Sequence, residues 1–241
     1  MRSFFTTILL FTASLVASAQ TNNDNVLKFL GHPVDGRKSD MESHLISKGY
    51  TYNRTYDCYE GRFNGKQANI CISTNNNKID RIYVEFLPTS ESYIRYEYNN
   101  LIDQFNRNNK YTSIIKNEKI SENENISYGI NIQNKQYSAT YFLATQIDSA
   151  SIAIEIKEKA SSIFTDEEIE LIRASKNPDF NFEDLKPKEQ DVLMNYLALC
   201  YELLSNKFKG CVWFTIHEKY GEYYIGIYYD NLNNRPNGED L

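Results

Sequence analysis

The chain has 241 residues and a formal net charge of −6 at pH 7. This acidic balance argues against a general nucleic-acid-binding protein, which needs clustered lysine and arginine to displace counterions from phosphate. With 41% hydrophobic and 14% aromatic residues, most of the chain is expected to fold around a core rather than stay disordered.

Residues 1–19 have the pattern of a removable export signal. Arg2 supplies a positive start, the segment 4–16 is apolar, and 17–19 form a cleavage site of small residues. The apolar segment is shorter than the roughly 20 residues that a membrane-spanning helix needs, and no later segment reaches that length. We therefore predict an exported protein, periplasmic or secreted, with no transmembrane segment after signal removal.

The first part of the predicted fold is a short strand, a helix and a three-stranded meander. Ser39 followed by Glu42 is a capping box that predicts the start of the helix, and Gly49 predicts its end. The pair Asn64-Gly65 is a strong hairpin signal. The predicted elements are a strand at 26–30, a helix at 39–49, and strands at 50–59, 66–74 and 78–87.

Alternation along the last of these strands predicts a sheet with one buried face. One side of this strand carries the apolar residues Ile82, Val84 and Phe86. The opposite side carries Arg81, Tyr83 and Glu85.

The second part of the chain repeats the order of a helix followed by strands. A helix is predicted over 92–108, and the polar segment 117–125 is predicted to be a mobile loop. The repeated order suggests a duplicated unit, with tandem units at 26–88 and 92–158. The predicted strands lie at 111–116, 126–133, 136–144 and 151–157.

The C-terminal part is predicted to hold two helices and a hairpin. Thr165 and Glu168 form a second capping box, and Pro187 suits the first turn of the last helix. The apolar positions of this helix span a wide arc, which indicates burial on two sides. The hairpin has strands at 211–219 and 223–230 and a turn at Tyr220-Gly221.

These elements together predict an α+β fold. Antiparallel meander sheets carry helices packed on one face, and a C-terminal helical segment ends in a β-hairpin. The predicted boundaries are 1–19 for the signal peptide, 20–160 for the meander domain, and 161–241 for the two helices with the hairpin.

All four cysteines follow the export signal, and an even number in an exported chain favours disulfides. A zinc site is the alternative, but there is no Cys-x-x-Cys pair and no histidine at a ligand spacing from a cysteine. The turn at 64–65 places Cys58 opposite Cys71 on a non-hydrogen-bonded pair, so we predict that they are bonded. A second bridge is predicted between Cys200 on the last helix and Cys211 at the start of the next strand.

Several short segments carry a resemblance to known proteins: FLGHPVDG at 29–36, KGY at 48–50, FNG at 63–65, YYDN at 228–231 and GEDL at 238–241. Because of these segments, the chain resembles a family of uncharacterised exported proteins of anaerobic gut bacteria. At the level of the fold, the helix-and-meander units resemble the β-lactamase-inhibitor-protein fold and the SmpA/OmlA-type outer-membrane assembly lipoproteins. The resemblance implies a binding module rather than an enzyme.

No motif in the chain indicates catalysis or a cofactor. The chain has no G-x-S-x-G, H-E-x-x-H, P-loop or G-x-G-x-x-G sequence. Glu167 and Glu168 are best explained as first-turn residues that complement a helix dipole. A hydrolase that uses two carboxylates on a glycan or peptidoglycan remains an alternative, as does a structural component of the envelope.

The terminal hairpin carries the candidate binding residues Trp213, His217, Tyr224 and Tyr228. Its turn pairs Trp213 with Tyr228 and His217 with Tyr224 on one face, while the other face is apolar. Aromatic side chains with a polar tip are favoured in binding surfaces. The alternative is that the last helix covers this face, which would make the aromatics part of the core. We predict a non-enzymatic binding or protein-interaction module for an unknown protein or glycan partner.

Overall fold

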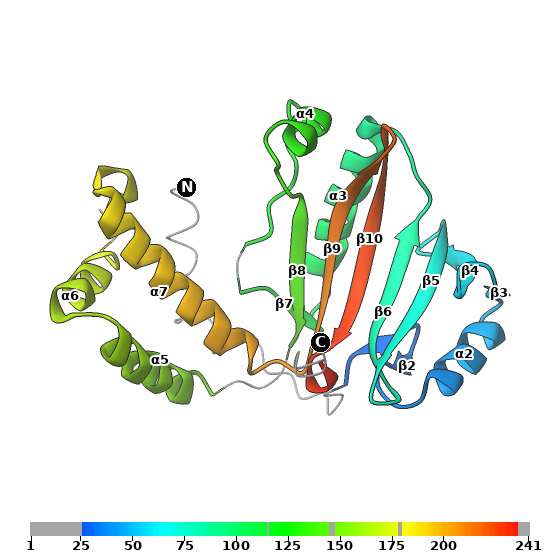
Figure 1. The fold of residues 1–241 in the computed structure, drawn as a ribbon, viewed down its shortest axis with the longest axis horizontal. Coiled ribbons are helices and arrows are strands. Elements are labelled where there is room, and N and C mark those ends of the chain that lie inside the picture. The colour runs from blue at the N-terminus through cyan, green and yellow to red at the C-terminus, as the bar shows by residue number, and fades with distance from the viewer. Residues whose placement is uncertain (1–25, 115, 145–147, 178–179, 236–241) are drawn as a thin grey trace. The chain divides into compact units, whose positions relative to one another are not determined.

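The computed structural model describes residues 26–114, 116–144, 148–177 and 180–235, and the predicted signal peptide at 1–19 lies outside them. The chain divides into two compact units, a sheet unit and a helical unit (Figure 1). The sheet unit comprises Asn23–Ser113, Asn117–Ala144 and Lys209–Leu241, and the helical unit includes Ile114–Lys116 and Thr145–Phe208.

The described part of the sheet unit is built on an eight-stranded antiparallel sheet, and a two-stranded sheet of β1 (Lys28–Phe29) and β2 (His32–Pro33) accompanies it. The strand order is β3-β4-β5-β6-β10-β9-β8-β7, so the terminal hairpin joins the two meander halves in the middle of the sheet (Figure 1). The strands are β3 (Thr51–Asn53), β4 (Cys58–Phe63), β5 (Lys66–Asn75), β6 (Lys78–Phe86), β7 (Tyr111–Thr112), β8 (Ser138–Leu143), β9 (Gly210–Lys219) and β10 (Glu222–Asn231), and the short helix η2 (Leu232–Asn234) follows β10.

Helices α2 (Lys38–Ser47), α3 (Glu91–Asn106) and α4 (Ile126–Asn131) all contribute to one core. That core contains Met41 of α2, Tyr98 of α3 and Ile126 of α4, together with Val84 of β6 and Phe214 of β9. Because alternate residues of a strand face opposite sides, the core lies on one face of the sheet, and the predicted α+β fold is confirmed.

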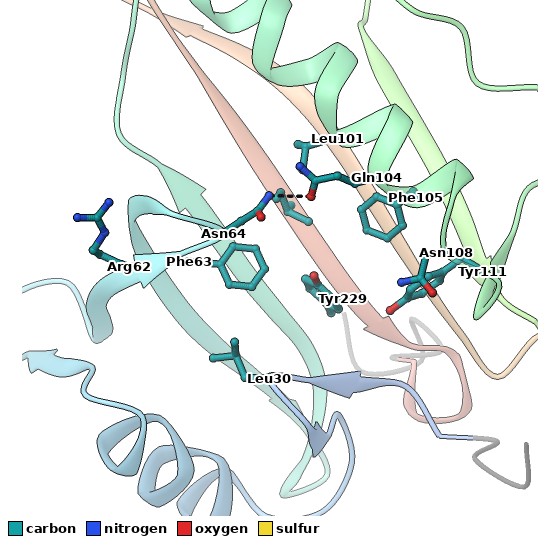
Figure 2. Close-up of a pocket in the computed structure, with 11 residues that line it drawn as sticks. Leu30, Arg62, Phe63, Asn64, Leu101, Gln104, Phe105, Asn108, Tyr111 and Tyr229 are labelled. Carbon is teal, nitrogen blue, oxygen red and sulfur yellow. Dashed lines mark hydrogen bonds between the residues drawn. The ribbon is translucent and has the colours of Figure 1, made fainter.

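The hairpin of β4 and β5 confirms the predicted turn and the first disulfide. Asn64 and Gly65 both have positive φ, 50° and 79°, as the two-residue turn requires. Cys58 pairs with Cys71 across the strands, and the two are bonded with their Cα atoms 4.4 Å apart. The hairpin tip is tied to α3, since Asn64 Nδ2 donates to Gln104 Oε1 at 2.9 Å (Figure 2).

The structure corrects the second predicted bridge, because Cys200 and Cys211 are free and buried. Cys200 lies on α7 (Pro187–Ser205) of the helical unit beside Tyr196. Cys211 lies on β9 of the sheet unit and pairs with Asp230 of β10. Burial raises the pKa of both thiols, that of Cys211 to about 12, so neither forms a reactive thiolate readily near neutral pH.

Alkylation of the denatured, non-reduced protein is expected to modify two thiols, at Cys200 and Cys211. Cys58 and Cys71 should react only after reduction, because they are bonded to each other. Peptide mass mapping before and after reduction measures this directly. Recovery of an unmodified peptide pair that joins Cys200 to Cys211 would contradict the expectation.

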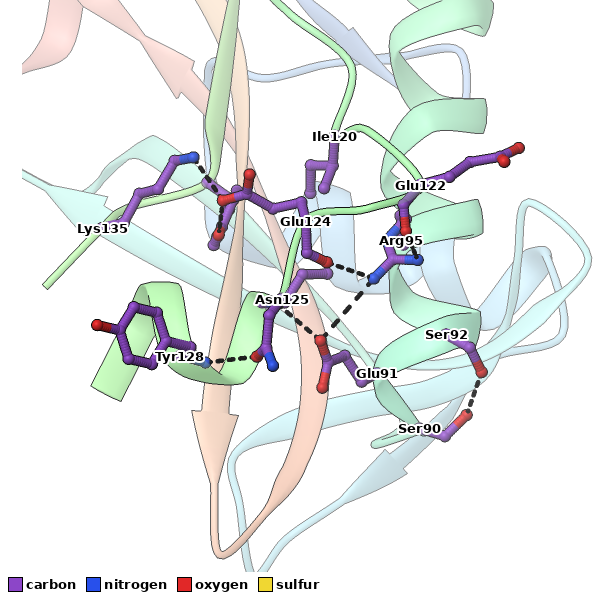
Figure 3. A network of polar contacts seen from close by, with 12 residues as sticks. Ser90, Glu91, Ser92, Arg95, Ile120, Glu122, Glu124, Asn125, Tyr128 and Lys135 are labelled. Atoms are coloured by element: carbon purple, nitrogen blue, oxygen red, sulfur yellow. Dashed lines mark hydrogen bonds and ion pairs between the residues drawn. The ribbon is translucent and has the colours of Figure 1, made fainter. Parts of the chain in front are cut away.

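The loop at 117–125 is fastened to α3, which differs from the mobile loop that its polar composition predicts. The side chain of Arg95 donates to the backbone oxygens of Glu122 and Glu124 at 2.9 and 2.6 Å (Figure 3). Asn99 accepts from the backbone N–H of Ile120 and donates to its oxygen, both at 2.8 Å. Side chains of the helix thus satisfy backbone groups that a free loop would leave to water.

The same loop also protects an edge of the sheet. Asn117 donates to the backbone oxygen of Thr140 at 2.9 Å and accepts from its N–H at 3.1 Å. Thr140 lies on β8 just beyond the residues that pair with β7. The amide of Asn117 therefore occupies backbone groups that an edge strand would otherwise present to another chain.

Two segments that were predicted as strands are helical. Asn125 caps α4, accepting from the backbone N–H of Tyr128 at 2.7 Å, where a strand at 126–133 was predicted. A strand predicted at 151–157 lies within α5 (Ser149–Ile163), which Asp148 caps. In α5, Ile152 and Ile156 are buried whereas Ile154 is 59% exposed. The spacing of four residues between the buried pair suits a helix, so it overrides the apparent alternation.

Two boundaries in the first part of the chain also differ from the prediction. Helix α2 begins at Lys38 with Arg37 in the cap position, so Ser39 does not form the predicted capping box. The strand predicted at 50–59 is divided into β3 and β4 by a turn in which Asn53 accepts from the backbone N–H of Thr55 at 2.9 Å.

The described helices of the helical unit are α5, α6 (Asp166–Ala174), the short helix η1 (Phe182–Asp184) and α7. Thr165 and Glu168 form the predicted capping box, and Pro187 occupies the first turn of α7 as predicted. Ile172 of α6 and Leu193 of α7 pack in a common core. Within the described residues of the whole chain, none of the helices combines the length and hydropathy that a membrane span requires.

Candidate binding site

The terminal hairpin has the predicted register, and one face of it carries the candidate residues. Trp213 pairs with Tyr228 and His217 with Tyr224, while Phe214 pairs with Ile227 on the core side. The four candidate residues are half-buried, whereas the core-side residues are almost fully buried. The structure therefore brings Trp213, His217, Tyr224 and Tyr228 together on the face opposite the core.

Strand β6 adds residues to the site that were not predicted from the sequence. It pairs with β10, so that Tyr83 lies opposite Tyr228, Arg81 opposite Asp230 and Glu85 opposite Gly226. We call the resulting surface the aromatic face, and its members are Arg81, Tyr83, Glu85, Trp213, His217, Tyr224, Tyr228 and Asp230.

Three aromatic rings stack across three strands of the aromatic face. The rings of Trp213 and Tyr228 are nearly parallel, 7° apart, with centroids separated by 3.8 Å. Tyr83 stacks on Tyr228 with centroids 4.8 Å apart. Burial raises the pKa of Tyr83 and of Tyr228, so both phenols stay protonated and present neutral hydroxyl groups at neutral pH.

A partly buried ion pair holds one end of the stack. Arg81 donates from Nε and Nη2 to the two oxygens of Asp230, at 2.6 and 2.9 Å. The indole N–H of Trp213 donates to the same carboxylate at 2.9 Å. The guanidinium lies 5.3 Å from the ring centroid of Tyr228, within the range of a cation–π contact. The hydrogen bond to Asp230 raises the pKa of Arg81, which therefore keeps its charge.

His217 closes the other end of the stack. Its Nε2 lies 3.1 Å from the hydroxyl of Tyr228, and its ring stacks on Tyr224 with centroids 5.0 Å apart. Burial lowers the pKa of His217, although nearby Glu85 acts in the opposite direction. The imidazole is therefore neutral at neutral pH and serves as a hydrogen-bonding partner rather than a cation.

Gly226 makes room for this arrangement. A Cβ at this position would lie 2.9 Å from the ring of Tyr83, 3.1 Å from His217 Nε2 and 3.1 Å from the hydroxyl of Tyr228. Because real Cβ atoms rarely approach so closely, any larger residue would displace the rings from above the strand.

A small polar pocket of about 240 Å³ lies at the Arg81 end of the aromatic face. Asp80, Arg81, Asp230 and Arg235 line it. Asp80 falls where the register between β5 and β6 shifts, so no residue of β5 pairs with it. Its Oδ1 is buried and has no hydrogen-bond partner among the described residues.

The comparisons with known proteins found no match: no protein-family model, no curated protein and no solved structure matches the chain.

Proposed function

We propose that this protein is an exported, non-enzymatic interaction module that binds a partner protein on its aromatic face. The observation that carries the proposal is the ordered stack of Trp213, Tyr228 and Tyr83, fixed by Arg81 and Asp230, on the sheet face opposite the core. Tryptophan, tyrosine and arginine are the residues that contribute most to binding at protein interfaces. Because its members are already stacked and hydrogen-bonded, the face would lose little conformational entropy on binding.

The stacking favours a protein over a glycan as the partner. Both faces of the Tyr228 ring are occupied, by Trp213 on one side and Tyr83 on the other. A sugar ring needs an open aromatic face, whereas ring edges, hydroxyl groups and a guanidinium suit a protein surface. The adjacent pocket, lined by Asp80, Arg81, Asp230 and Arg235, places charged groups of both signs beside the stack, which suits the polar side chains of a partner protein.

Export is part of the proposal and rests on two observations. The pattern at 1–19 is that of a signal peptide. The bond between Cys58 and Cys71 is of the kind that persists in oxidising compartments such as the periplasm or the extracellular medium. The resemblance to exported proteins of gut bacteria is consistent with this compartment.

The alternative of a carboxylate-based hydrolase has less support in the site. A general acid must be free to give up a proton, yet Asp230 accepts hydrogen bonds from Arg81 and from Trp213. Glu85 accepts from the hydroxyl of Tyr83 at 2.9 Å. These contacts support a positioning role for the two carboxylates.

Thr140→Arg is expected to abolish partner capture while leaving the fold intact. Thr140 lies on β8 directly opposite Trp213 and is only half-buried, so a long cationic side chain there would obstruct the aromatic face. Affinity capture from envelope and culture fractions, with the captured proteins identified by mass spectrometry, measures the effect. With the purified partner, we expect affinity to fall at least about tenfold.

Thr74→Arg is the matched control, because Thr74 is exposed near the end of β5 and lies outside the aromatic face. This variant should capture the same partner as the unmodified protein. The proposal is wrong if Thr140→Arg captures the same set of proteins as Thr74→Arg. If a glycan binds the unmodified protein but not Thr140→Arg, the partner is a sugar, and the proposal of a protein partner is wrong.

A further inference from the structure

A groove with an apolar floor lies on the core side of the sheet, opposite the aromatic face. Its volume is about 320 Å³, within the usual range for small-molecule sites. Figure 2 shows it between α3, the β4–β5 hairpin and strand β10. Ile227 and Tyr229 of β10 line its floor, and Leu30, Phe63 and Leu101 line its sides.

Two aromatic clusters give the groove rigid walls. On one side, Phe63 stacks on Phe29 with centroids 5.3 Å apart, and Tyr229 meets Phe29 edge-on at 5.0 Å. On the other side, Phe105 meets Tyr111 edge-on at 5.1 Å. The hydrogen bond from Asn64 of the hairpin to Gln104 of α3 spans the groove above Tyr229 (Figure 2). The groove is therefore held open by packed elements rather than by a flexible loop.

Within the part of the chain that the structure describes, two phenol hydroxyl groups of the groove have no hydrogen-bond partner. Tyr229 is only 8% exposed, and neither its hydroxyl nor that of Tyr111 makes a hydrogen bond within the described residues. In Figure 2 the hydroxyl of Tyr111 is turned toward Tyr229. A hydroxyl group in an apolar setting is expected to have a partner, which points to a ligand or to water in the groove.

The remaining hydrogen-bonding capacity of the groove is mostly that of a donor. Gln104 accepts from Asn64 at its Oε1, and Asn108 accepts from the backbone N–H of Lys110 at 3.1 Å. The side-chain N–H groups of Gln104 and Asn108 make no hydrogen bond within the described residues. With the two phenols, these groups match oxygen acceptors. Among the described residues that line the groove, none is a carboxylate and Arg62 is the single charged one.

We propose that this groove binds a small, mostly apolar molecule that carries a carbonyl or carboxylate group. The ring or hydrocarbon part would lie between Phe63 and Phe105, and the oxygen acceptor would receive hydrogen bonds from Tyr111 and Tyr229. A cationic ligand is disfavoured because the lining offers no carboxylate to pair with it. This site is independent of the proposed partner-binding function, since it lies on the opposite face of the sheet.

The test compares two probes that share a ring system and differ in charge, 2-naphthoate and 2-naphthylmethylamine, at millimolar concentrations. Amide chemical shifts measured by NMR should move at Phe63, Leu101 and Tyr229 when naphthoate is added. The amine should bind at least about tenfold more weakly, because it cannot accept hydrogen bonds from the phenols.

Tyr229→Phe and Tyr111→Phe are each expected to weaken naphthoate binding about threefold to tenfold, as the loss of one hydrogen bond predicts. Neither variant should lower the melting temperature, because each removes a hydroxyl that has no partner in the described structure. Tyr220→Phe is the control, since Tyr220 is 94% exposed at the hairpin turn, and it should bind as the unmodified protein does.

Three results would each overturn the proposal. The first is the absence of shift changes at the groove with naphthoate. The second is equal binding of the amine and the carboxylate. The third is unchanged naphthoate affinity in both phenylalanine variants, which would show that the hydroxyl groups do not contact the probe.

Discussion

Phe214→Ala is expected to lower the free energy of unfolding of the sheet unit by about 3–5 kcal/mol, the range for truncating a fully buried aromatic side chain. Phe214 has no exposed surface, and its ring lies 5.3 Å from that of Tyr98 on α3 and 6.2 Å from that of Tyr141 on β8. The cavity would therefore open where a helix and two strands meet. Denaturant unfolding followed by tryptophan fluorescence measures the loss, because the single tryptophan, Trp213, lies in the sheet unit.

Thr215→Ala provides the matched control on the same strand. Thr215 follows Phe214 but lies on the opposite face and is half-buried, so its truncation should change stability by no more than about 0.5 kcal/mol. A loss below about 1 kcal/mol for Phe214→Ala, or equal losses for the two variants, would contradict the assignment of the core to the Phe214 side of the sheet.

Local pairing in the two hairpins was predictable from the sequence. A two-residue turn determines which residues face one another, so Asn64-Gly65 was enough to predict the bond between Cys58 and Cys71. Tyr220-Gly221 was likewise enough to pair Trp213 with Tyr228. These predictions succeeded because they depend on neighbours in the chain.

The pairing between β6 and β10 was not predictable in the same way. Alternation had already placed Arg81 and Tyr83 on the outer side of their strand, but no turn connects that strand to the terminal hairpin. Their contacts with Asp230 and Tyr228 join residues that lie about 150 positions apart. The three β6 residues of the aromatic face, Arg81, Tyr83 and Glu85, were therefore missed, and the available signal was the polar and aromatic outer side of their strand.

The misassigned helices show a different limit. In α5, isoleucines at alternate positions match a strand, but two of them also lie four residues apart and match a helix. The cap residue decides between the two, since Asp148 accepts from the backbone N–H groups of Ala150 and Ser151. A cap of this kind was a better guide than alternation over a few residues.

Asp230→Ala is expected to lower the free energy of unfolding by about 2–4 kcal/mol and to disorder the aromatic face. The side chain of Asp230 is 10% exposed and accepts from Arg81 and Trp213, whereas the side chain of Arg81 is 42% exposed. In the variant, water can therefore partly hydrate the guanidinium of Arg81, which has lost its partner. The expected loss of stability is thus smaller than for a fully buried ion pair. Denaturant unfolding measures the stability, and a red shift of the Trp213 emission would report the loosened ring.

Asp80→Ala tests whether this effect belongs to the hydrogen bonds of Asp230 rather than to the loss of an acid. Both acids line the same pocket beside Arg81, but Oδ1 of Asp80 has no partner among the described residues. The same substitution there removes a buried oxygen that has no hydrogen-bond partner among the described residues, so stability should change by no more than about 0.5 kcal/mol or should increase. Equal destabilisation by the two substitutions would mean that general charge around Arg81, and not the contacts of Asp230 with Arg81 and Trp213, holds the aromatic face together.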